Sequence, residues 1–165
     1  MPLKVTRKTR KKVWKDMLDS EWNYRYWGYL YQRYDKYERN SKIFLAISSS
    51  STVASWTFWT QIDWLWKGLS AISALLAITT PYMNWQNLME KTLELRTGWL
   101  DAMYIYEKLW RRIETSKIDQ EEIEKIIDEM VNKHKYLSTK SSGFVNNKIL
   151  AKRCQQEVLE SRKLS

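Results

Sequence analysis

The sequence predicts an all-α membrane protein, in which a two-helix transmembrane hairpin is joined to a cytoplasmic helical body. The 165 residues include only four glycines and two prolines, so turn residues are too few for a many-stranded sheet. Two runs without charged side chains lie mid-chain, and a heptad pattern follows them. We expect a basic tail and an aromatic-rich cytoplasmic helix over residues 1–42, the transmembrane hairpin over 43–86, and cytoplasmic amphipathic helices over 87–165.

The composition bounds the function. The formal charge of +9 favours an anionic partner, such as nucleic acid or anionic lipid. The chain has one cysteine, Cys154, and one histidine, His134, so we expect no intrachain disulfide and no metal site, and both residues are interpreted as structural. There is no Gly-rich phosphate loop and no nucleophile elbow in the sequence. We therefore predict no enzymatic activity and no cofactor.

Residues 13–42 contain no proline and one glycine, Gly28, which favours one long helix. Aromatic residues occupy nearly every face of this helix, so it should be contacted all round. They could stack nucleic-acid bases, as in single-strand binders. Packing or anchoring at an interface is commoner, so nucleic acid is not the partner we expect.

Residues 43–60 and 68–86 carry no side chain that is charged at neutral pH. Each run is about the length of a bilayer-crossing helix, ~17–20 residues at ~1.5 Å rise. The break between them is short, so the runs should form an antiparallel hairpin in a lipid bilayer. Indole and phenol rings at its ends would lie at headgroup depth. The interface anchors we predict are Trp56, Trp59, Trp64 and Trp66 on one side, and Tyr82 and Trp85 on the other.

Basic residues are distributed unequally around the hairpin. Residues 1–42 carry twelve, the turn carries one, Lys67, and the chain after Trp85 carries fifteen. The positive-inside rule then places both termini in the cytoplasm and the protein in the cell (inner) membrane.

Small residues share one face in each run. In the first run these are Ser48, Thr52 and Ser55; in the second they are Ser70, Ser73, Ala77 and Thr80. Small residues let membrane helices approach closely, and we favour this packing role for the resting state. The alternative is a hydroxyl-lined pore, which the same face could form after rearrangement.

A heptad seam begins at Trp85 and predicts a long helix. The seam should hold together an oligomer or the helical body. A capping box, formed by Asp119 and Glu122, then predicts a new helix, with a linker at residues 138–143 and a last helix at about 144–163. The seam comprises Trp85, Leu88, Thr92, Leu95, Trp99, Ala102, Tyr106, Leu109 and Ile113.

This layout resembles a known family. The stretch YRYWGYLYQRYDKYERNSK runs into the two apolar segments, and WLDAMYIYEKLWRRI follows them. Over roughly residues 20–160 the chain resembles the SLATT domain, a bacterial two-transmembrane effector of nucleotide-signalling and other anti-phage conflict systems. It differs in its serine-heavy first membrane helix. The resemblance implies a homo-oligomer that permeabilises the cell membrane and is triggered by a separate sensor or regulator.

Two other functions fit the same sequence. One is a membrane scaffold or anchor that forms no pore. The other is a soluble helical binding module, in which the two apolar runs are core helices.

Overall fold

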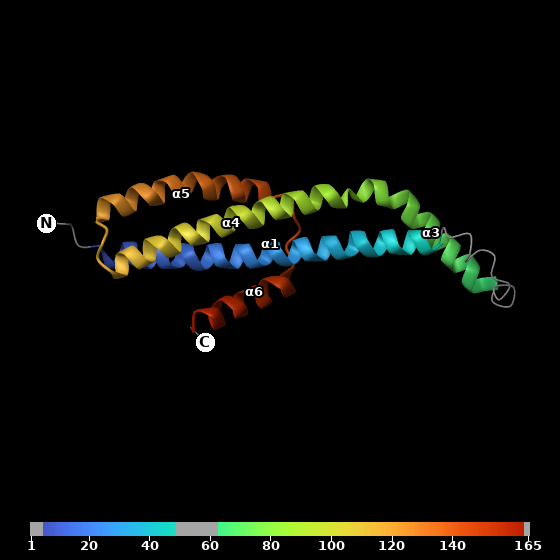
Figure 1. Ribbon diagram of the computed structural model, residues 1–165, viewed down its shortest axis with the longest axis horizontal. Coiled ribbons are helices and arrows are strands. Elements are labelled where there is room, and N and C mark those ends of the chain that lie inside the picture. Colours follow the sequence, from blue (N-terminus) through green and yellow to red (C-terminus); the bar gives the residue numbers. More distant parts are fainter. Residues whose placement is uncertain (1–4, 49–62, 164–165) are drawn as a thin grey trace. The chain divides into compact units, whose positions relative to one another are not determined.

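The computed structural model describes residues 5–48 and 63–163, and all the regular structure among them is helical. This confirms the predicted all-α class. The helices are drawn in Figure 1. They are α1 (Arg7–Ser48), α3 (Asp63–Met83), α4 (Trp85–Glu114), α5 (Gln120–Ser141) and α6 (Lys148–Ser161).

The chain forms two compact units. The first joins Met1–Leu30 to Lys91–Ser165, and the second is Tyr31–Glu90. α1 continues without a break through residue 42, and the division of the chain at residues 42 and 86 stays a prediction. Residues 7–12, which we expected to belong to a basic tail, form the first turns of α1.

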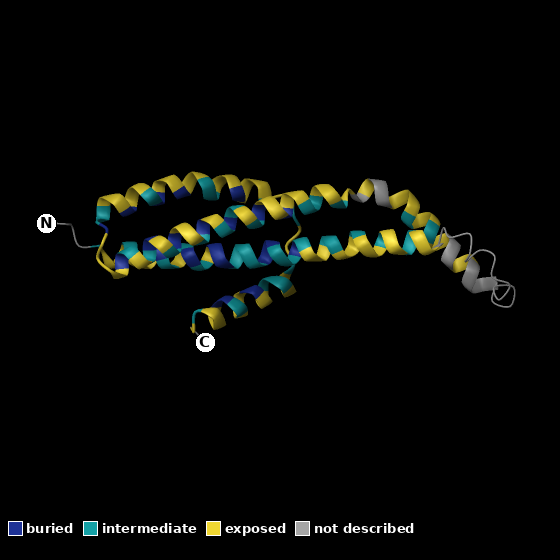
Figure 2. Ribbon diagram, in the orientation of Figure 1, coloured by how far each residue is buried: buried dark blue, intermediate teal, exposed yellow. Residues whose placement is uncertain are grey.

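The core of the first unit lies between α1, α4 and α5. Figure 2 shows the buried positions of these helices, with α4 exposing its other faces. The buried residues of α4 are spaced alternately by three and four positions, as predicted for the seam. Residues with this spacing lie along one side of a helix, so they can all face the core. The buried residues of α4 are Thr92, Leu95, Trp99, Ala102, Tyr106, Leu109 and Ile113.

The turn before α5 confirms the predicted start of that helix. The carboxylate of Asp119 accepts a hydrogen bond from the backbone N–H of Glu122 at 2.9 Å, which caps the helix. Ile118 and Ile123 are both buried, as a hydrophobic staple requires. In a complete capping box the side chain of Glu122 would accept a hydrogen bond from the backbone N–H of Asp119. Here the carboxylate of Glu122 pairs instead with the guanidinium of Arg112 at 2.7 Å.

The end of α5 and the start of α6 differ from the prediction. α5 continues through Ser141, so residues 138–141 of the predicted linker are helical. α6 begins at Lys148 rather than near 144, because the side chain of Asn147 caps it by accepting from the N–H of Leu150.

The second unit contains the later part of α1, all of α3 and the first residues of α4. Asn84 separates α3 from α4 with a positive φ of 38°, and its side chain accepts from the N–H of Asn87 to cap α4. Most of the first apolar run, residues 49–60, lies outside the described residues. Within the described ranges, no helix is both long enough and apolar enough to cross a membrane.

Candidate functional site

Helix α3 carries four large, exposed side chains on the outside of the second unit. Ile72, Leu75, Ile78 and Tyr82 are each more than half exposed, and Tyr82 reaches 85%. At 100° per residue these positions share one face, which we call the apolar stripe. Each large apolar side chain left in water forgoes roughly 1.5–3 kcal/mol relative to burial. The stripe is therefore a surface that favours an apolar partner.

The small residues of α3 lie on the opposite side of the helix. Ser70, Ser73, Ala77 and Thr80 are turned by about 180° from the apolar stripe. Ser73 is half-buried and Ala77 is exposed, while the side chains of the other two are not described. In the first run, Ser48 ends α1, and Thr52 and Ser55 lie outside the described residues.

The predicted interface anchors fall into three groups. Trp56 and Trp59 lie outside the described residues, and Trp64 and Trp66 belong to α3 without described side chains. Tyr82 is the exposed anchor that closes the apolar stripe. Trp85 is half-buried, with its ring centroid 5.9 Å from that of Tyr34 and 5.7 Å from that of Tyr37. The tyrosine-rich stretch therefore packs against Trp85.

The heptad seam lies in the core of a single chain. Leu95, Trp99, Tyr106, Leu109 and Ile113 are buried within the first unit without a second copy, and Leu88 is half-buried in the second unit. Of the two roles predicted for the seam, the described contacts fit the helical body. The oligomer role stays a prediction.

A buried carboxylate that the sequence did not reveal joins α1 to the C-terminal end of α6. Glu21 is 4% exposed and accepts hydrogen bonds from Arg25 of its own helix and from Ser161 and Arg162, at 2.7–2.8 Å. Burial raises the pKa of Glu21, but these three hydrogen bonds together outweigh burial and hold the pKa below its usual value. A lone glutamate in a helix carries no sequence signal of such pairing.

His134 and Cys154 both lie inside the first unit. The His134 ring is 5.0 Å from Trp99 and 5.6 Å from Tyr106, between centroids, and its buried Nε2 has no described hydrogen-bond partner. Burial lowers the pKa of His134 and raises that of the nearby Asp16. Burial also raises the pKa of the Cys154 thiol to about 11, which keeps it protonated at neutral pH.

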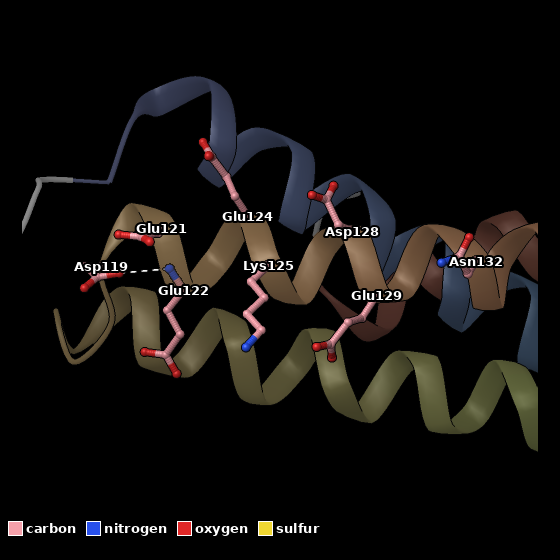
Figure 3. Close-up of a pocket in the computed structure, with 8 residues that line it drawn as sticks. All are labelled: Asp119, Glu121, Glu122, Glu124, Lys125, Asp128, Glu129 and Asn132. Carbon is pink, nitrogen blue, oxygen red and sulfur yellow. Dashed lines mark hydrogen bonds between the residues drawn. The ribbon is translucent and has the colours of Figure 1, made fainter.

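The outer face of α5 is acidic. Figure 3 shows a pocket whose lining comes from this helix and the turn before it. Several of the acids already have partners, such as Asp119 in the cap and Glu122 with Arg112. In the part of the chain that the structure describes, no three candidate ligands gather as a metal ion would require. The lining residues are Asp119, Glu121, Glu122, Glu124, Lys125, Asp128, Glu129 and Asn132.

Among the described residues, the apolar stripe of α3 is thus the exposed surface for association, whereas the polar contact between α1 and α6 is formed within the chain. We compared the chain with family models, with curated proteins and with solved structures, and none of them matches it.

Proposed function

We propose that the protein is a small membrane effector that oligomerises and permeabilises the cell membrane, in bacterial defence as the SLATT-type resemblance implies. The apolar stripe of α3 is the observation that supports this most directly. Between residues 68 and 83 there is no Asp, Glu, Lys, Arg or His, and the side chains of the apolar stripe are each more than half exposed. Hydrocarbon accepts such a stripe without needing a complementary shape.

The magnitude of this apolar surface favours association over insertion as a lone helix. Six strong apolar residues of α3, at ~0.5 kcal/mol each, favour insertion by only about 3 kcal/mol. The hydroxyl-bearing and small residues on the other face gain nothing from lipid and gain more from a neighbouring helix. An effector built in this way inserts into the bilayer when it associates with other copies. Without them it stays in its resting state.

The proposed location is the inner membrane with both termini in the cytoplasm. Twelve basic residues before the hairpin, one in its turn and fifteen after it support this topology. The trigger would be a separate sensor or regulator protein.

The test is flotation with liposomes that contain anionic lipid, combined with release of an enclosed dye. Full-length protein should float with the liposomes and release the dye. The double variant Leu75→Gln and Ile78→Gln removes half of the apolar stripe and should reduce both signals at least tenfold. The matched control, Ile105→Gln and Val131→Gln, changes two exposed aliphatic residues of the first unit and should keep both signals.

The other outcomes separate the alternatives. Flotation without dye release would favour the membrane scaffold. Protein that stays with the soluble fraction, and dye that stays enclosed, would overturn the proposal in favour of a soluble binding module.

A further inference from the structure

In the described part of the chain, α6 and the segment before it are tied to one helix, α1. The contacts are hydrogen bonds, ion pairs and ring contacts, and each of them is made with a residue between 21 and 29 of α1. Figure 1 shows α6 on one side of α1 and α4 on the other, with α5 beyond α4 in that view. The contacts join Trp22 to Ala151, Tyr26 to Asn147, Trp27 to Phe144, Tyr29 to Glu157, and Glu21 to Ser161 and Arg162.

The contact combines two buried residues of α6 with specific polar pairs. Cys154 and Val158 are the buried residues of α6. The phenol of Tyr29 donates to Glu157 at 2.6 Å, and the guanidinium of Arg153 lies 4.4 Å from the Tyr29 ring centroid. Because residues 21–29 of α1 supply this whole set of partners, the same contact can form with an α6 from another copy.

The segment that connects α5 to α6, and the first turn of α6 itself, leave apolar side chains in water. Val145 is 91% exposed and Ile149 is 84% exposed. Gly143 has open space where a side chain would begin. Exposed aliphatic residues at a connection are covered when two copies exchange the element that follows, because the two connections then run past each other.

We propose that two copies exchange α6, so that the α6 of each lies on α1 of the other. The two copies then meet through Val145 of the connecting segment and Ile149 of the first turn of α6. The occupant of the α1 face is thus a second copy of this chain. The inference rests on the self-association in the proposed function and not on membrane binding.

The test uses two full-length chains with complementary charge reversals, Glu21→Arg and Arg162→Glu, purified in mild detergent. In either chain alone like charges meet at the buried position, so α6 should leave α1 and the chain should stay monomeric. In an equimolar mixture, exchange restores an opposite pair at both positions. A dimer containing both chains is expected by light scattering and tag capture, with at least tenfold more dimer than in either chain alone.

Two controls keep the result interpretable. The chain carrying both reversals restores an opposite pair within itself and should behave as the unaltered protein, which shows that the reversed pair is compatible with folding. In the unaltered protein, Val145→Gln with Ile149→Gln should weaken dimerisation at least tenfold. A mixture without a mixed dimer, or a dimer that is indifferent to Val145 and Ile149, would overturn the exchange. Flotation and dye release test the membrane proposal separately.

Discussion

The guanidinium of Arg162 donates a hydrogen bond from Nε to Oε2 of Glu21 at 2.8 Å and so ties the C-terminal end of the chain to α1. Ser161 and Arg25 also donate to this carboxylate, which is almost fully buried. A buried carboxylate is tolerated only when its partners satisfy it, so the three donors and the carboxylate act as a unit.

Glu21→Gln should destabilise the protein by about 1–3 kcal/mol at pH 7, because Arg162 loses its counter-charge and Arg25 keeps only its longer pair with Glu157, at 3.5 Å. The folded-state pKa of Glu21 lies below its usual value, so its contribution is present above about pH 4.5 and is lost as pH falls through the folded pKa. The variant should therefore lose less stability on acidification. Urea unfolding at pH 7 and at lower pH measures this. Glu160→Gln, at an exposed position of α6, is the control and should match the unaltered protein.

The two helical glycines of the first unit should respond oppositely to alanine. A Cβ at Gly98 would lie 2.5 Å from Cδ2 of the buried Leu137, whereas a Cβ at Gly28 would lie 3.4 Å from Nε of Arg96. Gly98→Ala should therefore destabilise by roughly 1–3 kcal/mol through overpacking. Gly28→Ala should be neutral or stabilise by up to about 1 kcal/mol through helix propensity. Thermal unfolding of both variants measures these changes in stability. A stabilised Gly98→Ala protein would contradict the close approach of α4 and α5.

The helices and the seam could be predicted from the sequence because both leave a periodic pattern of apolar residues. The spacing of Leu95, Trp99 and Tyr106 repeats over several turns, and Asp119 marks the start of α5 with a capping side chain. The boundary of α6 was misplaced, because nothing before Asn147 distinguishes its cap from other polar positions in that linker. Partnerships such as Glu21 with Arg162 join residues 141 apart, and one sequence gives no information on such pairs.

His134 should make the fold sensitive to mild acid. Burial lowers its pKa below 6.5, and the carboxylates of Asp16 and Asp19 offset this only in part. The unfolded chain then binds a proton more readily, so stability is full above about pH 6.5 and declines as pH falls through the folded pKa. His134→Gln should reduce the decline between pH 7 and pH 5 in denaturant unfolding. Asp16→Asn should make the loss from His134 larger, because it removes an offsetting charge.

The seam should be essential for folding of the single chain. Leu95 and Leu109 are buried in the core of the first unit, whereas Leu93, on the same helix, is exposed. Leu95→Asp or Leu109→Asp places a carboxylate in an apolar core and should cost several kcal/mol, enough to unfold that unit. Leu93→Asp should change stability by less than about 0.5 kcal/mol. Circular dichroism and elution volume together measure this. A folded monomer from Leu95→Asp would instead favour a seam that holds an oligomer.

The small face of α3 should act through helix packing. Ser73→Leu with Ala77→Leu puts bulk where neighbouring helices would approach, so the crosslinked oligomer should be lost. Flotation should persist or rise, because leucine favours the bilayer. The control is Ala71→Leu, which adds the same bulk beside the apolar stripe and should leave oligomer size and dye release unchanged.

The corresponding triple change of Ser48, Thr52 and Ser55 to leucine tests the first run. An intact oligomer that no longer releases dye would place the hydroxyl face at a pore lumen, because leucine closes a polar passage without separating the helices. An intact oligomer that still releases dye would show that this face neither packs helices in the oligomer nor lines a pore.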